Sequence, residues 1–253
     1  HLKKKKLIGL FKLLIMCDLS VIILCGGLGT RLRSKIGNET PKILAPIGDY
    51  CFFDYLLQWI DDSLDEISYE LIFCLGYGSR KIEDKINKLK LKVSLSFEEK
   101  QLGTYPAVLD ASKLAKSENL LIINGDTLFK MKFEKYFQIF LNSSDSFLFI
   151  TENNLKKTKK NGYKINRNSG RLEYSEAYPA YISMGALFLK KVYLESFKKK
   201  REDINQLLDK ELIAKINPYP IKVKNKFDFI DIGTPEDYQY AQTKLPDLYP
   251  LKK

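Results

Sequence analysis

Histidine is almost absent from this sequence of 253 residues, in which the only example is His1. A Ser/His/Asp or Cys/His catalytic arrangement and a metal site built on histidines are therefore excluded from the fold. The four cysteines, Cys17, Cys25, Cys51 and Cys74, lack a C-x-x-C spacing. This pattern argues against a zinc site or a disulfide framework and indicates reduced cysteines in a cytoplasmic protein.

Long apolar runs are also missing, since no stretch beyond the N-terminal region approaches the ~20 apolar residues that span a bilayer. A hydrophobic content of 45% with 29% charged residues is typical of a globular protein. The formal net charge is +11, from 42 basic and 31 acidic residues. This excess alone is compatible with nucleic acid, a membrane surface or an anionic small substrate as the partner.

The N-terminal segment holds five of these positive charges, because residues 1–15 contain five lysines and no acid. We interpret residues 1–15 as a leader or tag-like basic segment, with Met16 as the natural start. A surface helix and a membrane address are the alternatives. Residues 16–253 contain no internal repeat and no linker, so we expect a single domain there.

Strand and helix patterns alternate over residues 20–125, which predicts an α/β fold with a doubly wound, mostly parallel central sheet. The expected strands are 20–25, 69–75, 91–97 (near an edge) and 119–124, and the expected helices are 52–60, 79–88 and 107–115. Further along, strand patterns at 146–151, 171–175 and 181–189 indicate added antiparallel strands around a polar, turn-prone segment, 152–170. Helices at 192–199 and 203–214, a final strand pair at 220–223 and 229–232, and a helix from Pro235 complete the prediction.

A glycine-rich loop, Gly26-Gly27-Leu28-Gly29-Thr30-Arg31-Leu32, follows the first buried strand. Its glycines let backbone N–H groups approach an anion, and Arg31 adds a fork-shaped cation suited to phosphate. Lys42, held after Pro41, supplies a second cation. The spacing is neither that of a P-loop nor a full G-x-G-x-x-G, so a P-loop NTPase or a dinucleotide dehydrogenase is not favoured. A plain glycine turn is the structural alternative.

Two carboxylates follow expected strands at positions where α/β sheets place ligand-contacting groups. Asp126 ends the run Asn124-Gly125-Asp126, and Asp231 interrupts an apolar strand. An acid in such a strand costs free energy unless it is paired or binds a cation. We assign helix capping to Glu236 and Asp237, and we interpret Asp231 as a ligand.

The pattern G-G-x-G-T-R-L followed by P-K resembles the sugar-1-phosphate nucleotidylyltransferase family over essentially all of residues 20–245. Segments 21–32 and 229–238 look closest to the bacterial heptose 1-phosphate guanylyltransferases. The resemblance implies a Rossmann-like nucleotidyltransferase fold and an enzyme that joins an NTP to a sugar 1-phosphate. Pyrophosphate would leave, and the NDP-sugar would be GDP-heptose for surface polysaccharide synthesis.

Residue roles follow from the same resemblance. It makes Arg31 and Lys42 catalytic, and it assigns Mg²⁺ to Asp126 and Asp231 with GTP or another NTP as substrate. The expected nucleotide-binding residues are Leu24, Gly26, Gly27, Gly29, Thr30, Glu98, Gly103, Thr104, Asn124 and Gly125. The expected sugar-phosphate-binding residues are Gly162, Glu176 and Gly185.

The chain departs from the family pattern at two places. The E-x-x-x-L-G-T stretch that lies against the base in the family is followed by two small residues, whereas Tyr105-Pro106 stands here, which leaves base choice open. The family lysine that meets the sugar phosphate is replaced by Ala177, with Lys164 or the lysines of 156–160 as substitutes. The family N-G-G entry is here Ser183-Met184-Gly185.

Three other functions compete with this hypothesis. They are a cytidylyl- or uridylyltransferase for another sugar or a non-sugar phosphate, a non-catalytic nucleotide-sugar-binding regulator on the same fold, and a nucleic-acid or membrane-surface protein. The last is disfavoured because aromatic residues are not interleaved with the basic runs and no nucleic-acid-binding signature is present. We therefore expect NTP and sugar 1-phosphate as partners in the cytoplasm, with no nucleic acid and no stable membrane insertion, and we leave a homo-oligomer open.

Overall fold

The computed structural model describes residues 17–98, 104–153, 162–176, 178–195, 211–223 and 229–251. The basic segment 1–15, Met16 and the lysines of 156–160 lie outside the described residues, so the expectations for them stay predictions. Within the described ranges, every helix is too short or too polar to cross a membrane.

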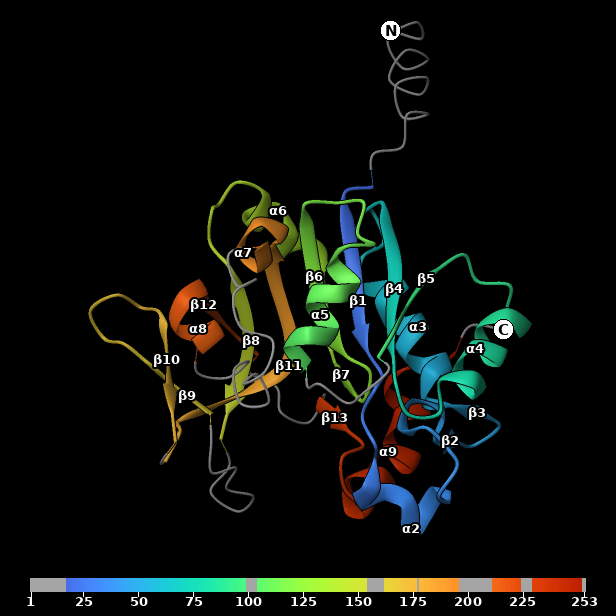
Figure 1. Ribbon diagram of the computed structural model, residues 1–253. Coiled ribbons are helices and arrows are strands. Elements are labelled where there is room, and N and C mark those ends of the chain that lie inside the picture. The colour runs from blue at the N-terminus through green and yellow to red at the C-terminus, as the bar shows by residue number, and fades with distance from the viewer. Residues whose placement is uncertain are drawn as a thin grey trace, which may run out of the picture.

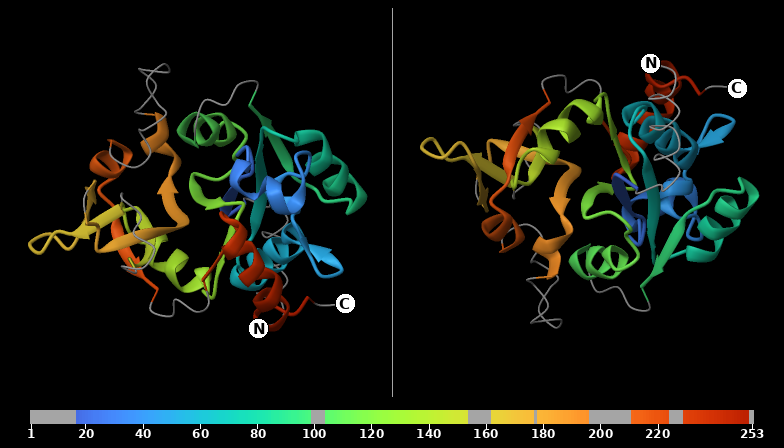
Figure 2. Two further views of the ribbon diagram at one scale, coloured as in Figure 1. Left: turned by 90° about the horizontal axis from the view of Figure 1, so that it is seen from below. Right: turned by 90° about the horizontal axis from the view of Figure 1, so that it is seen from above.

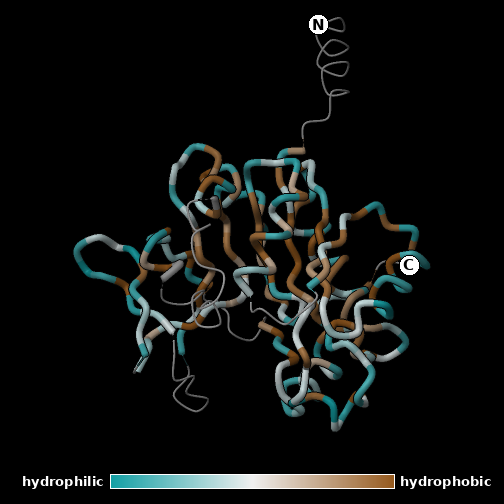
Figure 3. The backbone as a smooth tube through the Cα atoms, viewed as in Figure 1, coloured by the Kyte–Doolittle hydropathy of each residue, from teal (hydrophilic) through white to brown (hydrophobic). Residues whose placement is uncertain are grey.

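Strand β1 (Leu19–Leu24) lies at the centre of the fold (Figure 1). It pairs in parallel with β4 (Tyr69–Leu75) on one side and with β6 (Asn119–Asn124) on the other, and β5 (Ser94–Phe97) extends the sheet beyond β4. The apolar runs of these strands explain this placement, because a parallel strand is covered on both faces and needs apolar residues on each. Figure 3 shows the resulting concentration of hydrophobic residues in the central strands.

The second half of the chain adds mostly antiparallel strands to the same sheet. Strand β11 (Tyr181–Lys190) runs antiparallel to β6 and to β8 (Phe147–Glu152), and β12 (Tyr219–Lys222) pairs with β8 in parallel. The hairpin of β9 (Gly162–Ile165) and β10 (Leu172–Ser175) completes the order β10-β9-β11-β6-β1-β4-β5. The predicted fold class, a doubly wound α/β sheet with added antiparallel strands, is confirmed.

Helices cover both faces of this sheet (Figure 2). On one face, α3 (Phe52–Ser63), α4 (Ser79–Lys88), α6 (Phe133–Leu141) and α9 (Pro235–Leu248) pack against a core that contains Ile23 and Phe73. On the other, α5 (Thr104–Ser112), α7 (Lys191–Glu195) and α8 (Glu211–Ile216) pack against Ile22 and Ile72. The short elements η1 (Thr30–Leu32), α2 (Arg33–Ile36), η2 (Lys42–Leu44), β2 (Pro46–Ile47) and β3 (Tyr50–Cys51) lie between β1 and α3.

Several elements differ from the sequence prediction. The two final strands form where they were predicted, but they do not pair with each other. Strand β12 joins β8, whereas β13 (Phe229–Asp231) joins β7 (Thr127–Phe129) in a separate antiparallel sheet. Strand β9 lies inside the segment interpreted as turn-prone, and α6 and β7 were not predicted. A strand as short as β7 cannot be predicted from the local sequence pattern, because its three residues form their backbone hydrogen bonds with a distant segment.

An aromatic cluster fixes the position of β7. The indole N–H of Trp59 donates a hydrogen bond of 2.7 Å to the carbonyl of Phe129. The Trp59 and Phe133 rings lie 5.3 Å apart, and those of Phe133 and Phe149 lie 5.2 Å apart. Helices α3 and α6 therefore hold β7, and with it Asp126 and Thr127, against the central sheet.

We expect Phe133→Ala to lower the free energy of unfolding by about 3–5 kcal/mol, because it leaves a cavity in this fully buried cluster. The matched control is Ile139→Ala on the same helix, whose side chain is 50% exposed, with an expected change within about 0.5 kcal/mol. Urea unfolding followed by circular dichroism measures both values. Similar losses in the two variants would contradict the assigned role of the cluster.

Candidate active site

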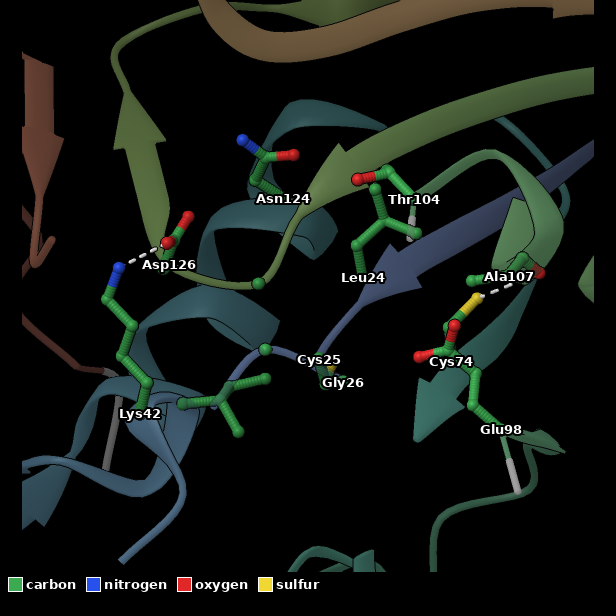
Figure 4. Close-up of a pocket in the computed structure, with 13 residues that line it drawn as sticks. Leu24, Cys25, Gly26, Lys42, Cys74, Glu98, Thr104, Ala107, Asn124 and Asp126 are labelled. Atoms are coloured by element: carbon green, nitrogen blue, oxygen red, sulfur yellow. Dashed lines mark hydrogen bonds and ion pairs between the residues drawn. The ribbon is translucent and has the colours of Figure 1, made fainter. Parts of the chain in front are cut away.

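A cavity of about 250 Å³ opens at the carboxyl ends of β1, β4 and β6 (Figure 4). This is the edge at which open α/β sheets bind their ligands. The lining residues are Leu24, Cys25, Gly26, Gly27, Lys42, Ile43, Cys74, Glu98, Thr104, Ala107, Asn124, Gly125 and Asp126. Nine of the sequence-predicted site residues are among them, and they come from β1, β6, the glycine loop, η2, α5 and the segments just after β5 and β6.

Glycine is required where three backbone segments meet at the cavity. The Gly125 N–H donates a 2.9 Å hydrogen bond to the Leu24 carbonyl, and a Cβ on Gly125 would lie 2.7 Å from that oxygen. A Cβ on Gly76, after β4, would lie 2.9 Å from the Cα of Gly26, and one on Gly26 would collide with the Glu98 carboxylate. Backbone groups therefore form the cavity surface between β1 and its neighbours, where N–H donors can face a ligand.

The Lys42 ammonium forms an ion pair with the Asp126 carboxylate at one wall of the cavity. Pro41 directs the chain into η2, and Gly29 of the glycine loop packs against the Lys42 side chain, so that a Cβ on Gly29 would lie 3.4 Å from the Lys42 Cβ. The Asp126 side chain remains 32% exposed and that of Lys42 16%. Both charges thus face the cavity rather than bulk solvent.

Asp231 lies beside this wall through the β7–β13 pairing. It is opposite Thr127 in the register, and the Ile232 N–H donates to the Asp126 carbonyl at 3.1 Å. Its Oδ1 accepts a 2.6 Å hydrogen bond from the Gly233 N–H. The fold thus brings Asp126, in the turn just before β7, close to Asp231, at the end of β13, from positions 105 residues apart in the chain.

These two carboxylates fit a magnesium ion that completes its coordination with substrate phosphates and water, as is usual for this cation. Among the described residues no group of three or more His, Cys, Asp or Glu side chains could form an all-protein cage. The interpretation of Glu236 and Asp237 as caps needs correction, because Thr234 caps α9 by accepting from the Asp237 N–H. Asp237 assists by accepting from the Thr234 hydroxyl at 2.8 Å.

Glu98 lines the opposite side of the cavity, just after β5. Burial raises the pKa of its carboxyl group, and the nearby charge of Asp110 raises it further. Its Oε1 atom is buried and has no hydrogen-bond partner among the described residues. A buried acceptor without a partner is costly, and a ligand that brings a donor would remove this cost.

Tyr105 does not occupy the cavity. Its ring is 4% exposed and lies in the core beneath α5, and its hydroxyl donates to the Leu194 carbonyl at 3.3 Å. Burial raises the pKa of Tyr105 to about 12. The cavity-facing positions of α5 are the small residues Thr104 and Ala107, so the bulk of Tyr105 leaves the cavity open.

The remaining predicted site residues lie around the cavity rather than in its lining. Gly29, Thr30 and the exposed Arg31 precede or form η1. Gly185, in a bulge of β11 with φ +76°, packs against Asn124: a Cβ there would lie 2.6 Å from its Nδ2. The predicted residues Gly162 and Glu176 lie at one end of the β9–β10 hairpin, where Gly162 pairs with Ser175, the residue before Glu176. Gly103 and Ala177 lie outside the described residues.

Lys164 and the lysines of 156–160 are the candidate substitutes for the family lysine, and only Lys164 is among the described residues. Lys164 is exposed on β9 and pairs in register with Glu173 of β10. The lysines of 156–160 lie outside the described residues. The described part of the chain therefore does not bring Lys164 into the cavity, and its role stays a prediction.

The sequence analysis missed four lining residues, Cys25, Ile43, Cys74 and Ala107. Cys25 and Ile43 adjoin predicted site residues, and Ala107 lies three residues after Thr104, close to one helical turn. Cys74 belongs to the strand that pairs with β1, so its position near the carboxyl end of an expected parallel strand was the available signal. Burial raises the pKa of both cysteines, which leaves these thiols protonated and poorly reactive.

Comparison with known proteins agrees with this fold. The family model described as nucleotidyl transferase matches residues 20–247. The chain belongs to the nucleotidyl transferase family, and the prediction of a nucleotidyltransferase enzyme is confirmed.

Two curated relatives match nearly nine-tenths of the chain or more. The chain is 31% identical over 239 residues to D-glycero-alpha-D-manno-heptose 1-phosphate guanylyltransferase of Aneurinibacillus thermoaerophilus, covering 90% of this chain and 98% of the relative. It is 29% identical over 230 residues to the protein of the same name from Campylobacter jejuni, covering 88% and 98%. Among solved structures, HddC from Yersinia pseudotuberculosis superposes with a TM-score of 0.71 at 26% identity, covering 89% of this chain and 98% of HddC.

We expect Gly26→Ala to lower the free energy of unfolding by about 1–3 kcal/mol, because the added Cβ collides with the Glu98 carboxylate. Gly27→Ala is the matched control, since its Cβ would meet nothing within 4 Å. Adding Glu98→Ala to Gly26→Ala should recover most of the loss. Chemical denaturation measures all three variants, and equal stabilities of the two single alanine variants would contradict the proposed close packing.

Proposed function

We propose that this enzyme transfers a guanylyl group from GTP to a heptose 1-phosphate and releases pyrophosphate, forming GDP-heptose. The reaction class, formation of an NDP-sugar from an NTP and a sugar 1-phosphate, follows from the family and its two heptose 1-phosphate guanylyltransferase relatives. The observation that carries the proposal is one cavity with glycine backbone and the Lys42–Asp126 pair at one side and the Glu98 acceptor at the other.

In the proposed reaction a phosphate oxygen of the acceptor attacks the α-phosphorus of the NTP. The bond from that phosphorus to the oxygen bridging to the β-phosphate breaks, and pyrophosphate leaves with its electron pair. No protein nucleophile is needed, which agrees with a chain whose only histidine is His1. The enzyme contributes orientation and charge neutralisation.

Lys42, the glycine loop and Arg31 would each contact a different part of the triphosphate. Lys42, already at the cavity wall, would neutralise the α-phosphate, exchanging its bond to Asp126 for one to a phosphate oxygen. Gly26, Gly27, Gly29 and Thr30 would hold the triphosphate through backbone N–H groups. Arg31, exposed on η1 at the loop's end, would stabilise the departing pyrophosphate.

Asp126 and Asp231 would hold Mg²⁺, whose charge would neutralise phosphate oxygens when it is bound. The support is the strand pairing that brings these two carboxylates together and the exposure of Asp126 toward the cavity. Thr127 and Gly233 keep the two strands in register and fix the Asp231 side chain.

Glu98 supports guanine over pyrimidine bases. Guanine carries two adjacent donors, N1–H and the 2-amino group, which match the two oxygens of one carboxylate. Uracil and cytosine do not present such an adjacent donor pair. HddC from Yersinia pseudotuberculosis was also solved in complex with GMP-PN. The cytidylyl- or uridylyltransferase alternative loses one support, because Tyr105 points into the core.

We expect Arg31→Ala to abolish most turnover while leaving the fold intact, because the Arg31 side chain is exposed. A fall in kcat of at least about 100-fold is typical for removing one group that stabilises transition-state charge. Release of pyrophosphate from GTP and heptose 1-phosphate measures it, with Arg167→Ala, an exposed arginine in the β9–β10 turn, as control. Near-normal turnover would contradict the catalytic role, and binding without turnover in the unaltered enzyme would instead support the regulator hypothesis.

We expect Glu98→Gln to lower kcat/KM for GTP by about 10- to 100-fold, since a neutral amide offers guanine one acceptor in place of two charged ones. Its relative activity with UTP should rise, because an amide pairs with the N3–H and carbonyl of uracil. In the unaltered enzyme KM for GTP should rise as the pH falls through the raised pKa of Glu98, since protonation removes an acceptor. This acid limb should be missing in Glu98→Gln. An unchanged base preference would contradict base reading by Glu98.

A further inference from the structure

The glycine loop and the segment that carries Lys42 are both in contact with one residue outside the family motif, Tyr77, which follows β4. The Tyr77 N–H donates to the Gly26 carbonyl at 3.4 Å. Its hydroxyl donates to the carbonyl of Asn38, four residues before Lys42. A single residue thus connects the start of the glycine loop to the approach of η2.

The face of the Tyr77 ring supports Arg33. The Arg33 guanidinium carbon lies 5.0 Å from the ring centroid, within the range of a cation–π contact. From this position Nη2 of Arg33 donates a 3.3 Å hydrogen bond to the Leu28 carbonyl at the tip of the glycine loop. Within the described part of the chain, the Nε atom of Arg33 is buried without a hydrogen-bond partner. This indicates that stacking on Tyr77, rather than a full set of hydrogen bonds, holds the guanidinium.

Two further contacts join the start of α4 to the segment before Lys42. Gly78, the N-cap of α4 with φ +69°, lies so near Pro41 that a Cβ there would be 2.5 Å from the proline ring. Lys81 in the first turn of α4 forms a 3.2 Å ion pair with Glu39. The segment 76–81 therefore packs along both the glycine loop and residues 38–41.

A loop with three glycines in four residues needs such contacts, because glycine has more backbone freedom to lose than any other residue. Of its residues, Gly27 has open space around its Cβ position, and Leu28 is 41% exposed, so core packing does not order the tip. The Tyr77–Gly26 and Arg33–Leu28 hydrogen bonds hold the loop at its start and at its tip. Preorganised N–H donors then meet an anion without an ordering cost at the moment of binding.

We propose that Tyr77 and Arg33 are positioning residues that hold the glycine loop and the Lys42 segment in the conformation that binds the triphosphate. We call their arrangement the brace: it consists of the Tyr77–Arg33 stack and its hydrogen bonds to Gly26, Leu28 and Asn38. This inference rests on the proposed function, in which those two segments bind phosphate. Neither side chain lines the cavity, so both act through the backbone that does.

The test compares Tyr77→Ala, Tyr77→Phe and the unaltered enzyme, with Tyr240→Ala on the outer part of α9 as the matched control. Inorganic pyrophosphate is the binding probe, measured by calorimetry below the unfolding temperature of each variant, and KM for GTP and for the acceptor are measured beside it. We expect Tyr77→Ala to weaken pyrophosphate binding and to lower kcat/KM for GTP by up to about 100-fold, the scale of a 1 Å misplacement. Tyr77→Phe, which keeps the ring and loses one hydrogen bond, should lose about 2- to 10-fold.

The acceptor KM separates positioning from a general structural role. A brace acts on the triphosphate side, so KM for the acceptor should stay close to that of the unaltered enzyme while KM for GTP rises. If Tyr77→Ala lowers only the unfolding temperature and binds pyrophosphate normally, the inference is overturned. If Tyr77→Ala does not fold, Tyr77→Phe and the Arg33 variants decide the same question.

Arg33 variants distinguish a brace from a phosphate ligand. Lysine keeps the charge but lacks the planar guanidinium that stacks on Tyr77, so Arg33→Lys should bind pyrophosphate as weakly as Arg33→Gln. Full rescue by Arg33→Lys would assign Arg33 a direct charge interaction and overturn the brace. If the unaltered enzyme binds neither GTP nor pyrophosphate, the proposed function itself is overturned. If all Tyr77 and Arg33 variants bind pyrophosphate normally, only the brace is overturned.

Discussion

The ion pair between Lys42 and Asp126 is the interaction on which the geometry of the site depends. It joins η2 to the end of β6 across 84 residues of chain, and it is partly shielded from water. Such a pair adds little net stability, because desolvation of both charges offsets most of their attraction. Its value is positional, since it keeps a cation and a carboxylate at one cavity wall until a phosphate competes for the lysine. Local rigidity elsewhere in the fold serves to hold these two side chains opposite each other.

That rigidity comes from two distant pieces of the chain. The aromatic cluster of Trp59, Phe129 and Phe133 anchors β7, and β7 in turn receives β13 with Asp231. On the other side of the cavity, Gly26, Gly76 and Gly125 allow three backbone segments to approach within distances that any side chain would prevent. The aromatic cluster and the three glycines both act on backbone position. This explains why the described cavity lining contains only three charged side chains, Lys42, Asp126 and Glu98.

The strength of local signals explains which elements were predictable from the sequence. The bounds of β4, β6 and α4 agree with the prediction, because continuous apolar runs and a regular amphipathic pattern are encoded within each segment. The glycine loop, Lys42 and Asp126 were recognisable as a group, since parallel strands end at one edge of the sheet. Strand β7 was not, because its three residues are ordered by β13 about 100 positions later.

The directions of individual side chains could not be predicted from the sequence either. Tyr105 follows the stretch expected near the base, yet its place in the core depends on Leu194, which receives its hydrogen bond from 89 residues away. Tyr77 carries no motif at all, and its contacts with Gly26, Asn38 and Arg33 exist only once β4 lies beside β1. Sequence patterns thus located the backbone of the site, whereas the side chains that shape it are set by long-range packing.

Under the proposed function, the distribution of charge around the cavity would also determine the orientation in which a nucleotide binds. Lys42 and the nearby Arg31 favour phosphates at the glycine-loop side, whereas an ionised Glu98 repels them from the other side. A nucleotide bound in reverse would place its triphosphate against a buried carboxylate, and its base donors against a lysine. The cost of burying Glu98, visible in its raised pKa and its unpartnered Oε1, is offset only when a base brings donors to it. In the proposed reaction the same carboxylate would therefore select both the orientation of the nucleotide and the chemistry of its base.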